Sequence, residues 1–266
     1  FEIELGDKST RLVLATINQS KNTKEFIIVV HDVTQLRRFD SMRRDFISNL
    51  SHELRTPVSV IRANSETLID GALEDKKQAK VFAKAILHNS ERLSDMVSSL
   101  LDLTRIEYGE LKLNFQNINL NEFIENFILS ISNLSKKKNI NIQYKPSHIG
   151  DINADPQAIE RILNNLVDNA IKYSKEDSQI VISTSNDSDD HIKVMVEDNG
   201  PGISDEDQDY IFGRFFRTAS ARATDNQGSG LGLAIVKHLV NSLNGEVGID
   251  SVPGKGSVFW FTVPKF

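Results

Sequence analysis

The pattern of apolar and polar positions changes twice along the chain, and each change predicts a different kind of structure. In residues 1–36, short apolar or alternating runs are separated by polar turns, which is typical of β-strands. From about residue 37 to residue 108, apolar residues recur every three or four positions, which predicts two long amphipathic helices. Beyond residue 113 the two kinds of pattern interleave, which favours an α/β sandwich with one sheet under a helical layer.

The N-terminal pattern predicts three strands, Phe1–Leu5, Arg11–Asn18 and Phe26–Val30. Three strands alone are only marginally stable, so we expect residues 1–36 to be the end of a larger domain. The chain begins with Phe1 rather than methionine, which adds to the expectation of a longer parent polypeptide. Any membrane anchor is expected in the segment upstream.

The helical pattern predicts an antiparallel hairpin. Its first apolar stripe covers residues 39–68 and contains Pro57, which should kink the helix or loosen a turn. Gly71 and the charged stretch Glu74–Lys77 break the pattern, and the second stripe covers residues 82–104. One hairpin cannot bury both stripes, whereas two copies side by side can do so in a four-helix bundle. The sequence therefore predicts a homodimer.

The predicted fold class is α+β and multidomain. It combines a dimeric four-helix bundle built from the hairpin, an α/β sandwich domain, and a short β fragment at the N-terminus, with boundaries at 1–36, 37–114 and 115–266. In the last range the expected helices are Leu120–Lys137, Pro156–Tyr173, Asp205–Phe212 and Leu231–Leu243, and the expected strands are Ile140–Tyr144, Gln179–Ser185, His191–Asp198, Gly245–Ser251 and Ser257–Val263.

Composition excludes several classes of function. The 266 residues carry a net charge of −6, which argues against a non-specific nucleic-acid binder. The chain has no cysteine, which excludes a disulfide scaffold, thiolate metal sites and a catalytic thiol. Its most apolar short run, Phe26–Val30, is far below the roughly 20 residues that a membrane-spanning helix needs.

A histidine in the first helix is the first candidate for chemistry. The apolar stripe passes through Leu50 and Leu54, whereas His52 and Thr56 fall on a polar face. An exposed imidazole has a nitrogen lone pair and can act as a nucleophile. Glu53 could accept the proton that His52 loses, and Thr56 could position a water one turn away. A histidine that is merely solvated is the simpler alternative.

Two asparagines on a predicted helix form the second candidate. Asn165 and Asn169 are four residues apart, so both amides project from one face. Neutral amide oxygens suit a Mg²⁺ that keeps its waters and bridges phosphates. Lys172 and Tyr173 follow, offering a cation for a phosphate and a ring for a base. Taken alone, the pattern would be better explained by a helix whose polar positions face solvent.

Two glycine-rich segments form the third and fourth candidates. Asp198 ends a predicted strand, where a carboxylate beside bare backbone can accept a hydrogen bond from the exocyclic amine of a base, and Gly200, Gly202 and Ile203 follow it. The second segment opens a helix, which makes it a potential phosphate cradle. It lacks the Lys-Ser or Lys-Thr of a P-loop and does not follow a strand. Its residues are Gly228, Gly230, Leu231, Gly232 and Leu233.

The segment between the glycine clusters could form a lid. Phe212, Arg214 and Arg217 combine an aromatic anchor with positive charge near the expected phosphates. An ordinary surface loop is the alternative.

Together, and in this order, these motifs resemble those of bacterial two-component sensor histidine kinases of the phosphate- or cell-wall-sensing type. The resemblance extends over residues 37–266, while residues 1–36 resemble the closing strands of a PAS sensor domain. The matching segments are Ser51–Pro57 for the H box, Asn165–Tyr173 for the N box, Asp198–Ile203 for the first glycine box, Phe212–Arg217 for the F box and Gly228–Ala234 for the second glycine box.

The resemblance implies an ATP- and Mg²⁺-dependent kinase that phosphorylates its own histidine. His52 would be the acceptor, Glu53 its base, and Thr56 the residue needed to dephosphorylate the partner. Asn169 would hold Mg²⁺ directly, with Asn165 assisting. The remaining implied contacts are Lys172 and Tyr173 with phosphate and adenine, Asp198 with the adenine amino group, and Gly200, Gly202, Gly230 and Gly232 shaping the pocket and its lid.

The resemblance also implies partners and location. The phosphoryl group would pass to an aspartate of a cognate response regulator, and the chain would be a homodimer without nucleic acid. It would be the cytoplasmic portion of a parent anchored in the cell membrane, touching the membrane only through upstream segments. In the F box, Gly213 stands where the family commonly has an acidic residue, and Phe216 where it commonly has tyrosine.

One substitution separates kinase from hydrolase chemistry. DNA gyrase, MutL and a heat-shock chaperone share the implied nucleotide fold, hydrolyse ATP, and carry a glutamate at the position matched by Asn165. An amide cannot act as a general base on water, so Asn165 favours delivery of the phosphoryl group to His52. Two alternatives remain: a protein acting mainly as a phosphatase on its regulator, and a non-enzymatic dimeric scaffold that binds nucleotide.

Overall fold

The computed structural model describes residues 2–5, 9–19, 26–107, 112–136, 138–219, 221 and 229–266. It consists of two compact units, Phe1–Ser59 and Val60–Phe266. The division falls within one long helix, α1 (Thr34–Ile69).

The first unit opens with an antiparallel sheet of three strands in the order β1-β2-β3. Its strands are β1 (Glu2–Leu5), β2 (Ser9–Gln19) and β3 (Phe26–Asp32), which confirms the three strands predicted from the sequence. Apolar side chains on this sheet are largely exposed, among them Ile17 at 63% and Ile28 at 60%. The assignment of this sheet to a PAS domain stays a prediction.

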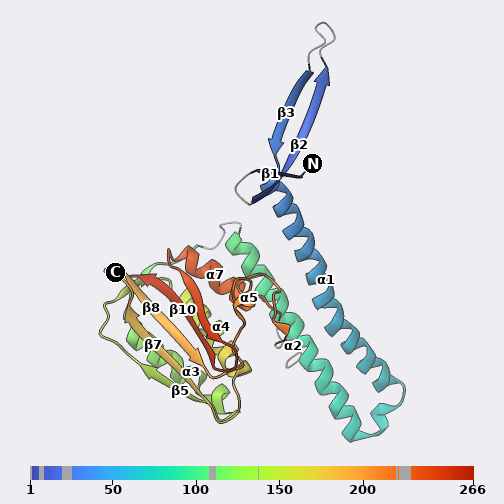
Figure 1. Cartoon of the computed structure of the whole chain (residues 1–266). Helices are drawn as coiled ribbons and strands as arrows, with labels where there is room; N and C mark the ends of the chain where they lie inside the picture. Colours follow the sequence, from blue (N-terminus) through green and yellow to red (C-terminus); the bar gives the residue numbers. More distant parts are fainter. Residues whose placement is uncertain are drawn as a thin grey trace. The chain divides into compact units, whose positions relative to one another are not determined.

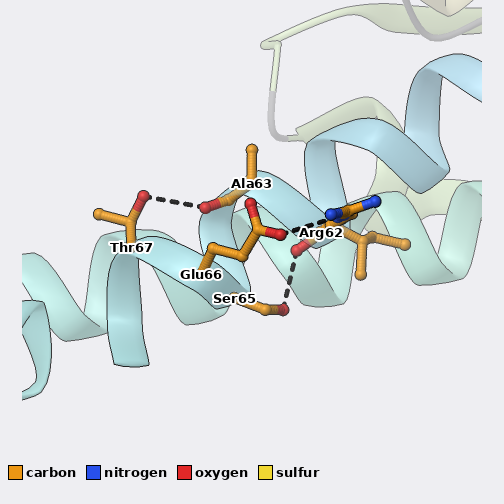
Figure 2. Close-up of polar contacts among 6 residues, drawn as sticks. Arg62, Ala63, Ser65, Glu66 and Thr67 are labelled. Atoms are coloured by element: carbon orange, nitrogen blue, oxygen red, sulfur yellow. Dashed lines mark hydrogen bonds and ion pairs between the residues drawn. The ribbon is translucent and has the colours of Figure 1, made fainter. Parts of the chain in front are cut away.

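Helix α1 is continuous over 36 residues, so Pro57 does not end it. Pro57 is buried. Several hydroxyls along it donate back to the carbonyl four residues earlier, as Figure 2 shows for Thr67, 2.9 Å from the oxygen of Ala63. The same figure shows the exposed pair of Arg62 and Glu66, 2.7 Å apart. These polar groups are therefore satisfied within the helix itself.

A short turn follows α1 and leads into the second long helix. Gly71 has φ = 128°, a conformation that favours glycine, and it precedes the 3₁₀ helix η1 (Ala72–Glu74). Helix α2 (Lys76–Glu107) then starts inside the charged stretch that was expected to be the break. The predicted helix–turn–helix order is confirmed.

The second unit contains a mixed sheet of five strands in the order β5-β7-β8-β10-β9 (Figure 1). Strands β5 and β7 are parallel, and the other neighbours are antiparallel. Burial alternates along the central strands, so one face is covered, and helices α3, α4 and α7 pack on it. The bounds are β5 (Asn141–Lys145), β7 (Gln179–Asn186), β8 (His191–Asp198), β9 (Val247–Val252), β10 (Gly256–Pro264), α3 (Leu120–Lys136), α4 (Pro156–Tyr173) and α7 (Gly232–Ser242).

Helix α4 is fixed at its start and along one face. The carboxylate of Asp155 accepts hydrogen bonds from the backbone of Gln157 at 2.8 Å and Ala158 at 3.1 Å, and Pro156 is the first helical residue. An apolar face is buried under the sheet, which leaves Asn165 and Asn169 on the half-buried side. The buried residues are Ala158, Ile159, Ile162, Leu163, Leu166, Val167 and Ala170.

The structure differs from the predicted elements in short segments. Strands β4 (Gln116–Ile118) and β6 (Ile152–Ala154) pair with each other but were not predicted, because three residues are too few to show an alternating pattern. The helix expected over Asp205–Phe212 is only α5 (Asp205–Gln208). Tight turns replace its second half, with the amide of Gly213 2.8 Å from the oxygen of Tyr210.

Candidate functional site

The second unit contains a cavity of about 690 Å³ beside the covered face of the sheet. Residues from α2, α4, α7, the ends of β8 and β10, and the loops between them line it. Four of the motifs found in the sequence meet here, although they are spread over some 70 residues of chain. The predicted site residues in its wall are Asn165, Asn169, Lys172, Tyr173, Asp198, Gly202, Ile203, Arg217, Gly230, Gly232 and Leu233.

The two asparagines present amides from consecutive turns of α4. The side-chain nitrogen of Asn165 donates to the carbonyl of Arg161 at 2.8 Å, so the amide is held by its nitrogen. Its oxygen is directed toward Gly232, where a Cβ would lie 2.7 Å away. Asn169 lies one turn further along the same helix and also lines the cavity. This orientation offers carbonyl oxygens where α7 begins.

Lys172 supplies positive charge in the same wall. Burial lowers its pKa to about 8, and the neighbouring guanidinium groups of Arg217 and Arg92 contribute to the shift. Its ammonium lies 5.4 Å from the centre of the Tyr173 ring. Because burial disfavours the charged form of Lys172, the site favours an anionic ligand such as a phosphate, which would stabilise that form.

Tyr173 and Arg217 connect the end of α4 to the segment that follows the F-box motif. Burial raises the pKa of Tyr173, while a hydrogen bond from Arg217 opposes that rise. The guanidinium of Arg217 also donates to the carbonyl of Ala221 at 2.7 Å. Arg217 thus connects Ala221 to Tyr173 in the cavity wall.

Asp198 is a buried carboxyl group at the end of β8. Only 6% of the residue is exposed. Burial raises its pKa, and backbone hydrogen bonds from Gly200 and Ser257 limit the rise. The Gly200 amide lies 2.7 Å from Oδ1. A carboxylate fixed in this way is an oriented acceptor, suited to an exocyclic amine on a planar base.

Two glycines are required by close approaches of the backbone. Gly202 has φ = 69°, and a Cβ there would overlap the carbonyl of Val252. Gly230 also has φ = 69°, and its Cβ would lie 2.8 Å from the Cα of Phe215. The amide of Phe215 donates to the carbonyl of Gly230 at 2.9 Å, which joins the F-box segment to the second glycine segment.

Some predicted residues lie outside the cavity wall. Gly200 acts through Asp198, and Leu231 is fully buried beneath the site. Phe212 and Arg214 do not line the cavity, whereas their neighbours Ile211 and Phe216 do. Gly228 lies outside the described residues.

The two departures from the family's F box have local structural correlates. A Cβ on Gly213 would lie 2.9 Å from the carbonyl oxygen of Tyr210, so a side chain there would require a different turn. Phe216 lies in the cavity wall with its ring centre 6.0 Å from that of Tyr210. This F-box segment therefore packs as a compact aromatic turn.

Other lining residues were missed from the sequence. Ser257 and Phe259 are alternate residues of β10, so the two-residue period after the Gly254–Gly256 turn could have placed them on the same face. Asp95 comes from α2, 70 residues before Asn165, and no local pattern marks it. The remaining missed residues are Asp168, Lys175, Pro201, Thr218, Ala221 and Ser229.

His52 lies in the first unit, on α1, and is exposed as predicted. Leu50 and Leu54 are half-buried, so the polar and apolar faces are divided as the sequence indicated. The hydroxyl of Thr56 donates to the carbonyl of His52 at 3.3 Å, and Glu53 is half-buried. The imidazole is thus accessible on a rigid helix.

Two protein-family models match separate parts of the chain. Residues 42–109 match the His Kinase A (phospho-acceptor) domain, and residues 154–266 match the Histidine kinase-, DNA gyrase B-, and HSP90-like ATPase. His52 falls in the first match, and Asn165, Asp198 and Gly232 fall in the second. The chain belongs to the bacterial two-component sensor histidine kinases.

Known sensor histidine kinases resemble this one over almost its whole length. WalK of Bacillus subtilis is 34% identical over 269 residues, covering 99% of this chain and 44% of WalK. SenX3 of Mycobacterium bovis is 36% identical over 247 residues, covering 92% of this chain and 60% of SenX3. This sensor histidine kinase chain therefore spans about half the length of the curated relatives it matches.

Solved histidine kinases share its fold. The histidine kinase ThkA, solved in complex with the response regulator protein TrrA, aligns with a TM-score of 0.69 at 25% identity, covering all of this chain and 78% of ThkA. The predicted fold class, a histidine-bearing helical hairpin with an α/β ATP-binding domain, is confirmed. Among the described residues, no helix has the length and apolar character needed to cross a membrane.

Proposed function

We propose that this sensor histidine kinase binds ATP in the 690 Å³ cavity and transfers its γ-phosphoryl group to His52. The main support for this proposal is that three kinds of side chain, each suited to a different part of Mg-ATP, line the same cavity. Asp198 offers an acceptor for the adenine amino group, Lys172 and Arg217 offer positive charge for phosphates, and the amides of Asn165 and Asn169 offer neutral oxygens.

The same wall fits a Mg²⁺ ion shared with the nucleotide. We propose that Asn169 holds the ion directly and that Asn165 assists. The side-chain nitrogen of Asn165 donates to the carbonyl of Arg161, so its oxygen is the atom that can assist. Within the described residues, no group of three or more His, Asp or Glu could hold a metal. The ion would therefore depend on phosphate oxygens and water, and when bound it would neutralise phosphate charge.

The proposed step is a direct displacement at phosphorus. The lone pair of the His52 imidazole forms a bond to the γ-phosphorus, and the bond from that phosphorus to the β,γ-bridging oxygen breaks, releasing ADP. The imidazole proton passes to Glu53, the adjacent carboxylate. Asn165 cannot remove a proton from water, which disfavours hydrolysis as a competing reaction.

We propose a homodimer and a response regulator as partners. Apolar side chains on the hairpin helices are exposed in a single chain, with Val58 at 50%, Val97 at 47% and Leu101 at 54%, and a second copy would cover them. The phosphoramidate of His52 would pass its phosphoryl group to a regulator aspartate. Support for the regulator comes from ThkA, which was solved with TrrA, and from the exposed side chains of Ser48 and Asn49 beside His52.

Dephosphorylation of the regulator is a second proposed activity, favoured by the position of Thr56. Its side chain is exposed one turn beyond His52 and could position a water near the regulator's phosphoryl group. Thr56→Ala should reduce phosphatase activity and leave autophosphorylation intact. Thr67→Ala is the matched control, because Thr67 makes the same bond to the carbonyl four residues earlier. Full phosphatase activity in Thr56→Ala would exclude this role.

We propose the domain division 1–36, 37–114 and 115–266, with the first range PAS-like. Support comes from the two family matches, which fall inside the second and third ranges. We also propose that the full-length polypeptide is anchored in the cell membrane and that residues 1–266 lie on the cytoplasmic side of that membrane.

Autophosphorylation with ATP labelled on the γ-phosphate, in the presence of Mg²⁺, tests the proposed kinase. We expect label that is lost in acid, survives alkali and disappears in His52→Ala. His148→Ala is the matched control, since His148 is also exposed and its backbone carbonyl, rather than its ring, accepts from Asn186 at 3.2 Å. Nucleotide binding without label would favour the non-enzymatic scaffold, and label that persists in His52→Ala would exclude His52 as the acceptor.

A further inference from the structure

Lys138 lies outside the wall of the nucleotide cavity but binds the end of the helix that forms it. Its ammonium donates to the carbonyl of Ile171 at 2.9 Å and to that of Lys172 at 2.8 Å. The last four carbonyls of a helix lack partners within the helix. The amide of Ser174 takes the carbonyl of Ala170, and Lys138 satisfies the next two. A cation at this end also complements the helix dipole.

The last turn of α4 carries two of the residues that contact the cavity, Lys172 and Tyr173. The loop after β8 also approaches this turn closely, since a Cβ on Gly200 would lie 3.2 Å from the carbonyl oxygen of Tyr173. The turn thus lies beside the loop after β8 and is held by the two hydrogen bonds from the ammonium of Lys138. A change at Lys138 would be transmitted to Lys172 and Tyr173.

The backbone of Lys138 is itself anchored to the segment that follows α4. The carbonyl of Lys138 accepts from the amide of Asp177 at 3.3 Å. The next residue, Asn139, has φ = 54°, and its side chain donates to the carboxylate of Asp177. The amide of Asn141 donates to the carbonyl of Ser178 at 3.0 Å. Lys138 is thus a fixed support rather than a mobile surface lysine.

The charge of Lys138 also reaches the cavity. It is one of the positive groups that lower the pKa of Lys172, after burial, Arg217 and Arg92. Asp168 acts in the opposite direction. Removing the charge of Lys138 would therefore raise the pKa of Lys172.

We propose that Lys138 is a positioning residue for nucleotide binding: by capping the C-terminal turn of α4 it holds Lys172 and Tyr173 in place for the nucleotide. The inference rests on the proposed function, because it assumes that the cavity binds Mg-ATP. Lys138 acts through the two residues at the end of α4 and does not contact the nucleotide.

The test compares binding of the Mg²⁺ complex of β,γ-imido-ATP by calorimetry in four proteins. Lys138→Met removes the charge and both hydrogen bonds but keeps a long unbranched side chain. We expect the dissociation constant of the analogue to rise about tenfold. Lys138→Arg keeps a charged donor and should restore most of the affinity. Lys265→Met is the matched control, because Lys265 donates to the carbonyls of Ser188 and Asp189, both at 2.9 Å, outside the cavity wall.

A pH series separates this role from general destabilisation. In Lys138→Met the alkaline loss of affinity, set by Lys172, should move to higher pH than in the parent protein. If Lys138→Met does not fold, Lys138→Gln, a neutral donor, takes its place with the same expected shift.

Three results would contradict either the proposed function or the role of Lys138. Failure of the parent protein to bind the analogue would contradict the proposed function itself. Unchanged affinity and an unchanged pH profile in the Lys138 variants of a binding-competent protein would overturn the role of Lys138. An equal loss in Lys265→Met would do the same, since it would indicate a non-specific effect.

Discussion

The side-chain oxygen of Asn165 lies in the space that a side chain at position 232 would need, 2.7 Å from where a Cβ on Gly232 would be. Asn165 belongs to the middle of α4, and Gly232 is the first residue of α7. The proposed metal-binding amide therefore meets the N-terminus of a helix, where backbone amides favour phosphate. The absence of a side chain at Gly232 permits this approach.

Gly232→Ala should separate activity from stability. The new methyl group would displace the rotatable amide of Asn165, so we expect autophosphorylation to fall at least about tenfold as the amide that assists Mg²⁺ binding moves. Gly232 is the first residue of α7, where alanine and glycine differ less than in a helix interior, so the melting temperature should change little. Gly150→Ala is the control, since nothing lies within 4 Å of its Cβ position. Full activity in Gly232→Ala would contradict the proposed role of Asn165.

Lys172 should make nucleotide binding pH-dependent. Its pKa of about 8 means that it loses its charge as the pH rises through that value, so affinity for Mg-ATP should fall above pH 8. Lys172→Arg stays charged and should abolish the fall. Calorimetry between about pH 7 and about pH 9.5 measures both proteins. An identical alkaline decline in Lys172→Arg would show that another group titrates.

The same pKa has a consequence for stability without nucleotide. Because the folded-state pKa of Lys172 is below its ordinary value of 10.5, burying the charged form costs free energy below pH 8. That cost should disappear as the pH rises toward 10.5. Denaturant unfolding of the parent protein and Lys172→Met across this range should therefore converge at the alkaline end.

Asp198 should select adenine over guanine. Guanine presents an oxygen where adenine presents its amino group, and two facing acceptors repel, so we expect GTP to bind at least about 100-fold more weakly than ATP. Asp198→Asn should weaken ATP binding. Glu197→Gln is the control, because Glu197 precedes Asp198 on the same strand and is exposed outside this cavity. Equal affinity for ATP and GTP would contradict the assigned role.

The ion pair between Arg161 of α4 and Asp102 of α2 should stabilise the second unit. Their side chains are 35% and 24% exposed, so we expect a coupling free energy of about 1 kcal/mol in a double-mutant cycle with Arg161→Gln and Asp102→Asn. The Arg62–Glu66 pair is the control, since its side chains are 78% and 58% exposed and solvent screening should leave a smaller coupling. Coupling no larger than that of the control pair would contradict a stabilising role.

Elements with a long, regular pattern could be predicted from the sequence. Helix α4 has an apolar face, an Asp155 cap and a proline at its first position, and strand β8 alternates cleanly from His191 to Asp198. Both were predicted with their observed bounds. The residues at the ends of these two elements, Tyr173 and Asp198, then meet in one cavity.

Features that depend on tertiary contacts could not be predicted. Strands β4 and β6 have three residues each and exist because they pair with each other. Asp95 enters the cavity wall only because α2 packs against α7. Lys138 carries no sequence signal, since its role depends on carbonyls more than 30 residues away.

In the proposed reaction, the cavity binds the nucleotide and His52 accepts its phosphoryl group. The most direct test is to incubate the protein with Mg-ATP at neutral pH and to identify the phosphorylated residue by mass spectrometry without acid treatment. We expect a single phosphoryl group on His52 in the parent protein and almost none in Asn169→Ala. A phosphoryl group on another residue, or undiminished modification of His52 in Asn169→Ala, would contradict the proposed reaction.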